Sequence, residues 1–157
     1  MKLVEKLNES TKILSKCKVK NSNTIYLSKF PFFPRIMTTL ETADFLFINV
    51  HLEFWSKYFR KKELNNLYNY IESNKEKNII LVGDFNTEYN DKHLFKFIDK
   101  LSKIGINLVN NNNNTYEHKI IDFVFVCNKY KILNVWVKEI PKEVSDHNLL
   151  LVRIKKS

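Results

Sequence analysis

A short aliphatic run, Ile79-Ile80-Leu81-Val82, is the feature that most constrains the fold of this chain. Four consecutive aliphatic residues with no polar residue among them predict a strand that is buried on both faces. The run ends at Gly83, and a polar segment follows it directly. A sheet with both faces covered is typical of α/β proteins, so the run favours a layered fold of helices and strands.

Amphipathic periodicity predicts three helices, over residues 3–14, 58–74 and 92–104. In the second of these, Leu64, Leu67, Tyr68 and Ile71 follow the i, i+3, i+4, i+7 spacing, and the opposite face is charged and expected to be exposed. Gly105 is placed to end the third helix, because glycine readily adopts the left-handed conformation that follows a helix.

The remaining apolar segments alternate with polar residues as strands do. Residues 17–20 and 24–29 are predicted to form a hairpin around Asn21-Ser22-Asn23, and residues 36–40 and 45–52 a second hairpin around residues 41–44. Further strands are expected at 106–109, 120–127, 132–137 and 149–154. No linker interrupts the pattern, so residues 1–157 are expected to form a single domain.

Composition narrows the class of protein. A formal net charge of +9 favours polyanionic partners, but the lysine and asparagine richness is also typical of an AT-biased genome, which weakens that inference. No apolar run is long enough to cross a membrane, and the N-terminus does not resemble a signal peptide, so a soluble intracellular protein is expected. Cys17 and Cys127 are far apart and indicate neither a zinc site nor a disulfide framework; both are expected to be buried.

Four places combine polar side chains with very apolar strands: Asn49-Val50-His51-Leu52, Gly83-Asp84-Phe85-Asn86, Ile121-Asp122-Phe123-Val124 and Ser145-Asp146-His147. Each has a structural explanation, as a core histidine, a turn, a buried carboxylate or a helix cap. Burying a charge is costly, however, so a strand tolerates one mainly at its end or beside a partner. The four sets occur together in one chain and use the residue types that phosphoryl chemistry needs, so a shared functional site is the better explanation.

These motifs, in this order, resemble those of the endonuclease/exonuclease/phosphatase (deoxyribonuclease I-like) superfamily. That family has N-x-H-L, G-D-F-N, I-D-[YF]-[IVF] and S-D-H segments, and three further matches to family segments are Leu27-Ser28-Lys29-Phe30-Pro31, Arg60 and Thr115-Tyr116. The resemblance implies two packed mixed β-sheets flanked by helices, a four-layer α/β/β/α sandwich.

The resemblance also implies roles for six residues in hydrolysing a phosphoester. Asp84 would orient and deprotonate the attacking water, and Asn86 would donate its amide to a phosphate oxygen. His147 would contact the phosphoryl group while Asp122 accepts a hydrogen bond from its other ring nitrogen, which would raise the pKa of His147. His51 would be a second phosphate donor, and Asp146 would be a ligand of Mg²⁺ or Mn²⁺.

The chain departs from the family pattern at its start. The family's first strand, which carries an active-site Asn, and its next strand, which ends in a metal-binding Glu, have no counterpart, so the first sheet is expected to be incomplete. Glu5 and Glu9 lie on the predicted first helix rather than at a strand end. Unpaired strand edges favour pairing with another chain. A smaller departure is Leu149, where the family usually has proline.

Three functions therefore stay open from sequence. The first is a metal-dependent phosphodiesterase or nuclease, acting by in-line attack of a water on a nucleic acid or other phosphoester. The second is a phosphoinositide or small-phosphoester phosphatase of the same fold, because substrate-selecting loops do not transfer across a superfamily. The third is a catalytically inactive fragment that binds polyanions through its lysines.

Overall fold

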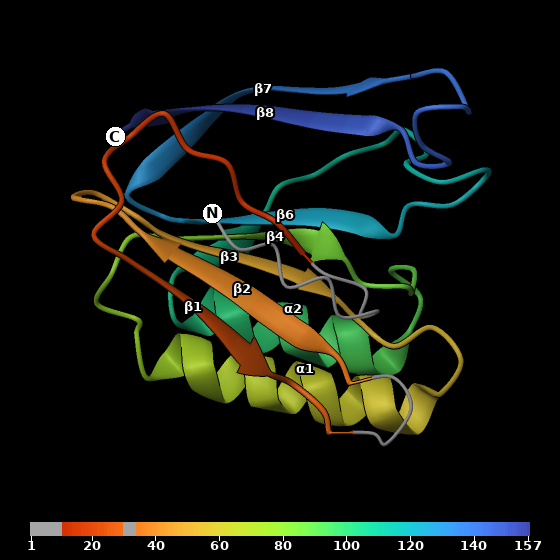
Figure 1. Cartoon of the computed structure of the whole chain (residues 1–157), viewed down its shortest axis with the longest axis horizontal. Coiled ribbons are helices and arrows are strands. Elements are labelled where there is room, and N and C mark those ends of the chain that lie inside the picture. The colour runs from red at the N-terminus through yellow and green to blue at the C-terminus, as the bar shows by residue number, and fades with distance from the viewer. Residues whose placement is uncertain (1–10, 30–33) are drawn as a thin grey trace, which may run out of the picture.

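The computed structural model of the chain describes residues 11–29 and 34–157, within which it contains eight strands and two helices (Figure 1). The helices are α1 (Lys57–Glu72) and α2 (Lys92–Lys103). The strands are β1 (Asn21–Tyr26), β2 (Ile36–Glu41), β3 (Leu46–His51), β4 (Ile79–Asp84), β5 (Ile106–Leu108), β6 (Asp122–Cys127), β7 (Tyr130–Lys138) and β8 (Leu149–Lys156).

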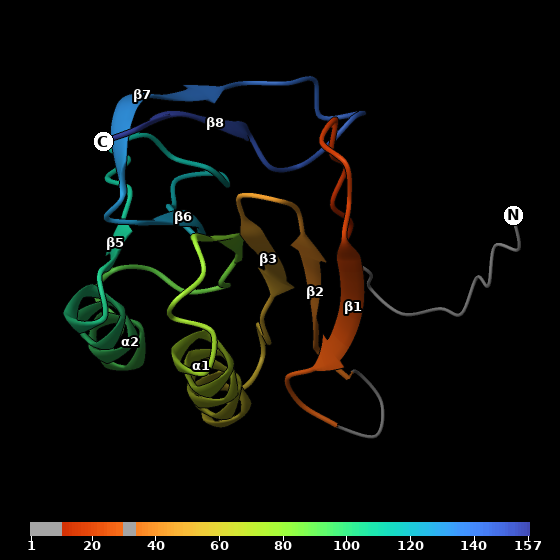
Figure 2. The ribbon, with the colours of Figure 1, turned by 90° about the vertical axis from the view of Figure 1, so that its left-hand side faces the viewer.

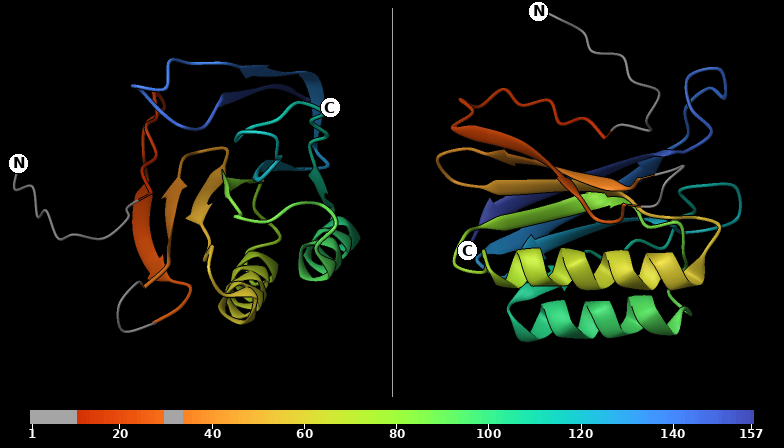
Figure 3. Two further views of the ribbon diagram at one scale, coloured as in Figure 1. Left: turned by 90° about the vertical axis from the view of Figure 1, so that its right-hand side faces the viewer. Right: turned by 60° about the horizontal axis from the view of Figure 1, so that its bottom comes forward.

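Six strands form one mixed sheet in the order β1-β2-β3-β4-β6-β5, and β7 and β8 form a separate antiparallel pair. Within the large sheet β3 and β4 run parallel, connected through α1, and the other neighbours are antiparallel. Figure 2 shows α1 and α2 on one side of this sheet and the β7–β8 pair on the other. The two helices lie side by side, as both panels of Figure 3 show.

Hydrophobic residues fill both interfaces of the large sheet. On the helix side Ile48, Leu81 and Phe125 pack with Leu67 and Leu101 of the two helices. On the other side Val124 and Val126 of β6 pack against side chains of the β7–β8 pair, among them Val135, Leu150 and Val152. The predicted α/β class with two packed sheets is confirmed.

The four-layer detail is not confirmed. The described residues form three layers, because neither described helix covers the outer face of the β7–β8 pair. On this pair Trp136, Leu149 and Leu151 are each more than 40% exposed. Pairing of the small sheet with another chain stays a prediction.

Strand β4 is central, as the aliphatic run predicted. Ile79 and Leu81 are buried against the helices, while Val82 packs toward the β7–β8 side. Gly83 has φ +148°, and a Cβ at this position would collide with the carbonyl oxygen of Val50 on β3. A side chain there would push β3 and β4 apart, so glycine is required immediately before Asp84.

Both described helices begin where the sequence predicts. The Ser56 side chain accepts a hydrogen bond from the Phe59 backbone N–H at the start of α1, and the Asp91 carboxylate accepts from the His93 and Leu94 N–H groups at the start of α2. Gly105 follows α2 with φ +77°, as predicted. The prediction of an exposed charged face on α1 is wrong in part, because two of its charged residues, Arg60 and Glu63, are buried.

The sequence was misleading at the beginning of the chain. Asn21, Ser22 and Asn23 do not form a turn; they lie in β1 and pair with β2 in the register Asn21↔Glu41. Their side chains are exposed on an edge strand, so polar residues are tolerated there despite their turn preference. Of the predicted first helix, residues 1–10 lie outside the described residues, and residues 11–14 are not helical. Cys127 is buried as expected, but Cys17 is exposed.

Candidate active site

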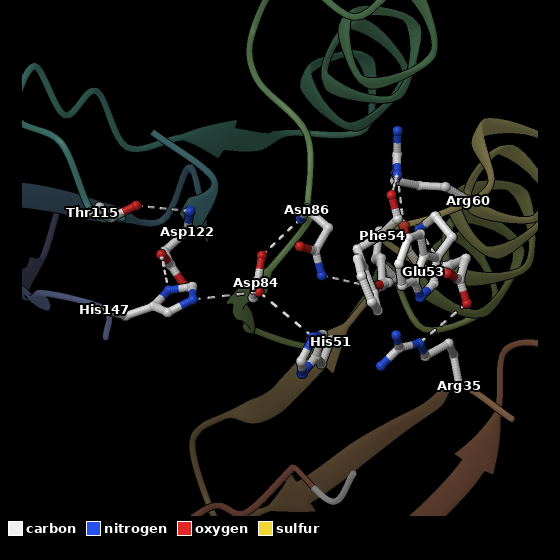
Figure 4. A network of polar contacts seen from close by, with 12 residues as sticks. Arg35, His51, Glu53, Phe54, Arg60, Asp84, Asn86, Thr115, Asp122 and His147 are labelled. Atoms are coloured by element: carbon white, nitrogen blue, oxygen red, sulfur yellow. Dashed lines mark hydrogen bonds and ion pairs between the residues drawn. The ribbon is translucent and has the colours of Figure 1, made fainter. Parts of the chain in front are cut away.

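The topology of the large sheet brings the polar strand ends together. Because β3 and β4 are parallel, His51 and Asp84 end adjacent strands and are paired in register. Because β6 runs antiparallel to β4, its first residue, Asp122, pairs with Asp84. His147 precedes β8 and bridges to Tyr116 in the loop before β6. Residues that are up to 96 positions apart in sequence thus meet at one edge (Figure 4).

A pocket of about 940 Å³ opens at this edge. Five of the six predicted site residues line it: His51, Asp84, Asn86, Asp146 and His147. The sixth, Asp122, lies behind His147 and is hydrogen bonded to it. The structure therefore brings together all six residues that the sequence singled out, although their roles remain predictions.

Asp84 lies between the two imidazoles. Its Oδ2 atom is 3.6 Å from Nε2 of His51 and 3.8 Å from Nε2 of His147, both longer than a direct hydrogen bond. Its Oδ1 atom accepts a 2.7 Å hydrogen bond from the Asn86 backbone N–H. The side chain is 13% exposed, and this burial raises the pKa of Asp84, opposed by the Asn86 hydrogen bond. The carboxylate is consequently more basic than an ordinary aspartate, as suits a proton acceptor.

Burial shifts the pKa of His51 in the opposite direction to that of Asp84. Burial lowers its pKa from the usual value, with Asp84 acting to raise it and the Arg35 cation acting to lower it. The imidazole is therefore mainly neutral at pH 7 and offers one N–H group as a donor.

His147 is held by a chain of contacts. Its Nδ1 atom lies 2.8 Å from Oδ2 of Asp122, so Nε2 is directed toward the pocket. Asp122 is positioned in turn by Thr115, which is fully buried and whose hydroxyl accepts hydrogen bonds from the backbone N–H groups of Ile121 and Asp122. The Tyr116 ring packs 4.8 Å from the imidazole. The Thr115-Tyr116 segment is thus a positioning element for the Asp122–His147 pair.

Asn86 adopts a left-handed conformation with φ 49°, which asparagine tolerates better than most residues. Its Nδ2 atom donates a 2.9 Å hydrogen bond to the Leu52 carbonyl oxygen. Because a primary amide carries two N–H groups, one is used to join the ends of β3 and β4 and the other is available to a ligand.

The predicted cation site is incomplete in the described part of the chain. Asp146 lines the pocket as an exposed carboxylate. In residues 11–29 and 34–157, no group of three or more His, Cys, Asp and Glu side chains is arranged to hold a metal ion. Glu5 and Glu9 lie outside the described residues. Of the residues considered as cation ligands from sequence, only Asp146 lies in the described part of the chain, and its role as a ligand stays a prediction.

Sequence reasoning missed part of the pocket wall. Phe54, Lys57, Lys92 and Lys119 also line the pocket, together with the Tyr116 ring. The exposed aromatic residue directly after the N-x-H-L-x segment was a signal for Phe54, since a large apolar side chain in a polar loop calls for an explanation. The lysines gave no such signal, because lysine is abundant throughout the chain.

Comparison with known proteins supports the fold and the family. The family model Exo_endo_phos_2, described as endonuclease-reverse transcriptase, matches residues 47–151, which is more than half of the chain. No curated protein matches the sequence significantly.

Three solved structures illustrate the structural similarity. An endonuclease/exonuclease/phosphatase from Bacteroides vulgatus has a TM-score of 0.72 at 20% identity, over 89% of this chain and 66% of that protein. A mannosyl-6-phosphatase from Bacteroides thetaiotaomicron has a TM-score of 0.68 at 19% identity, over 88% and 67%. The 3′ phosphatase NExo from Neisseria, bound to a product DNA hairpin, has a TM-score of 0.70 at 15% identity, over 90% and 73%.

The chain spans about two thirds of the length of the first two structures. At these identities the similarity establishes the fold alone, and the family model adds the assignment by sequence. None of the described helices is long and apolar enough to span a membrane. The fold, the matched residues and the grouping of the motif residues at one sheet edge agree: this chain belongs to the endonuclease/exonuclease/phosphatase family.

Proposed function

We propose that the chain is a phosphoester hydrolase that cleaves phosphodiesters, with nucleic acid as its substrate. The observation that carries this proposal is Asp84, a largely buried carboxylate with a raised pKa between two imidazoles at the base of an open pocket. A carboxylate activates a water, and flanking N–H donors stabilise charge on phosphoryl oxygens, which are the main requirements of in-line phosphoryl transfer. The names of the mannosyl-6-phosphatase and the DNA-bound 3′ phosphatase support phosphoester chemistry on this fold.

In the proposed reaction Asp84 accepts a proton from water as the water oxygen attacks phosphorus. The bond from phosphorus to the leaving oxygen breaks, and that oxygen takes up a proton from solvent to give an alcohol and a phosphomonoester. His147, oriented by Asp122, and neutral His51 donate N–H groups to the non-bridging oxygens. The free N–H of Asn86 is a third donor. A divalent cation with Asp146 among its ligands remains part of the proposal, and it would supply further charge stabilisation.

Turnover by the purified chain tests the proposal. A fluorescently labelled single-stranded oligonucleotide is incubated with the chain in Mg²⁺ or Mn²⁺, and cleavage is followed on a denaturing gel. His147→Gln is expected to lower kcat/KM about 10²–10³-fold, because a donor to the phosphoryl oxygens is lost. His118→Gln is the matched control, since His118 is exposed and does not line the pocket. Absence of cleavage, or equal activity in the two variants, would contradict the proposal and favour a polyanion-binding protein.

The pH dependence of kcat/KM provides a second test. The ionised form of Asp84 is the base, so activity should be present above its pKa and lost as the pH falls through it. Because burial raises that pKa above the usual 3.8, the acid limb of the profile should have its midpoint clearly above pH 3.8. A profile that stays flat down to pH 4, with the chain still folded by circular dichroism, would exclude Asp84 as the base.

A further inference from the structure

The loop between β3 and α1 presents two aromatic side chains beside the pocket. Phe54 lines the pocket and is 47% exposed, and Trp55 next to it is 79% exposed. Their ring centroids are 4.5 Å apart with an interplanar angle of 37°, so they pack on each other while both keep exposed surface. Two large exposed apolar residues at the rim of a polar pocket form a candidate contact surface for a ligand.

The backbone of this loop is held by buried charged residues. Glu63 accepts a hydrogen bond from the Glu53 N–H (2.8 Å), and the Glu53 carboxylate accepts one from the Trp55 N–H (2.8 Å). Arg60 Nη1 donates to the carbonyl oxygens of Glu53 (2.6 Å) and Phe54 (3.3 Å). In the view of Figure 4, Glu53 and Arg60 lie on the side of Phe54 away from Asp84. Three consecutive residues of the loop, Glu53, Phe54 and Trp55, are therefore each held through a backbone group.

This arrangement is unusual for a loop that merely connects two elements. Glu53, Arg60 and Glu63 are each at most 6% exposed, and burying charged groups is costly even when they are paired. The result is a rigid loop whose aromatic side chains face solvent. Rigid aromatic groups lose little conformational entropy on binding, which is the property of a preorganised contact surface.

The combination of aromatic rings with neighbouring lysines indicates the kind of ligand. Three lysines line the same pocket as Phe54, and the buried Arg35 guanidinium lies 5.7 Å from the Phe54 ring centroid. The lysines, Lys57, Lys92 and Lys119, stand among the carboxylates of Asp84, Glu88, Asp91 and Asp146. Aromatic faces interleaved with cations are the combination that single-stranded nucleic acid requires, with bases on the rings and phosphates beside the lysines. In a duplex the bases are stacked on each other, so an unpaired strand fits this surface better.

We propose that Phe54 and Trp55 stack an unpaired base of a single-stranded polynucleotide that is flanked by the phosphate bound at Asp84 and His147. This inference rests on the proposed function and specifies its substrate. The pair would thereby select strands with bases over other phosphodiesters.

Tryptophan fluorescence tests the stacking without relying on turnover. The chain has two tryptophans, Trp55 and Trp136, so Trp136→Phe leaves Trp55 as the single reporter. Asp84→Asn is added to keep the strand intact. Titration with a short oligothymidylate is expected to quench Trp55, whereas an abasic deoxyribose-phosphate strand of equal length should not.

Substitution of Trp55 shows how much base stacking contributes to affinity. In fluorescence anisotropy with labelled oligothymidylate, Trp55→Ala should weaken binding roughly 5- to 100-fold and leave affinity for the abasic strand unchanged. Phe95→Ala, which removes a phenylalanine that is 67% exposed on α2, is the matched control and should have no effect.

The outcomes separate the two proposals. Equal quenching by both strands, or none by either, would overturn the proposal that Phe54 and Trp55 stack a base, even if the chain hydrolyses oligonucleotides. Quenching by the strand with bases alone, together with weaker binding by Trp55→Ala, would establish base stacking. This result would hold even if the cleavage assay is negative and the proposed hydrolase activity is refuted.

Discussion

Asp84→Asn is expected to lower kcat/KM for oligonucleotide cleavage about 10²–10⁴-fold, the range for loss of a general base. The amide is nearly the same size as the carboxylate and can still accept the Asn86 backbone hydrogen bond at Oδ1, but it cannot take a proton from water. Initial rates at pH 7.5 measured below KM give kcat/KM directly.

The loss should not come from unfolding. For a carboxyl group with a raised folded-state pKa, the stabilising contribution is present below the unfolded pKa and is lost as the pH rises through the folded pKa. At neutral pH ionised Asp84 therefore destabilises the folded state. The Asp84→Asn variant should melt at the same temperature as the parent or at a higher one. Active sites commonly sacrifice stability in this way.

Asp91→Asn is the matched control for this prediction. Asp91 lines the same pocket, but its carboxylate caps α2, and asparagine caps helices about as well. The variant therefore makes the same charge change nearby without altering the proposed base. If Asp91→Asn and Asp84→Asn lose equal activity, the effect is one of pocket charge, and the role assigned to Asp84 is wrong.

The parts of the fold that could be predicted from sequence are those governed by local pattern. The aliphatic run of β4 and the periodic spacing of α2 each identified an element correctly, because side-chain periodicity reflects which face is buried. The sequence also singled out the six polar residues that the structure brings together at one sheet edge, since charged and imidazole groups at the ends of apolar strands are costly without a purpose; their roles stay predictions.

The parts that failed depend on contacts between distant segments. Nothing local distinguishes Glu63 of α1 from the exposed lysines beside it, yet its carboxylate is buried against Ser28, 35 residues earlier. Asn21 to Asn23 have turn propensity but are recruited as an edge strand by β2. Such outcomes follow from pairing and packing partners that a periodicity argument does not include.

Glu63→Ala is expected to destabilise the fold by about 2–5 kcal/mol, the range for leaving buried partners unsatisfied. Its Oε1 accepts a 2.6 Å hydrogen bond from the half-buried Ser28 hydroxyl and its Oε2 accepts from the buried Glu53 N–H, so removal leaves both donors without this acceptor. Thermal unfolding followed by circular dichroism should show a melting temperature lower by roughly 5–15 °C.

The loss of folding stability in Glu63→Ala should also depend on pH, and the burial of Glu63 determines whether it is larger in acid or in base. Burial raises its pKa above the usual 4.5, opposed by the Ser28 and Glu53 hydrogen bonds, so its stabilising contribution is full below pH 4.5 and falls as the pH rises through the folded pKa. Glu63→Ala should therefore cost more at pH 4 than at pH 8. Glu72→Ala, at an exposed position of the same helix, should change stability by less than about 0.5 kcal/mol at either pH. If Glu63→Ala behaves like Glu72→Ala, Glu63 does not hold the β3–α1 loop, and the rigidity on which base stacking depends would have to come from Arg60 and from the hydrogen bond between the Trp55 N–H and the Glu53 carboxylate.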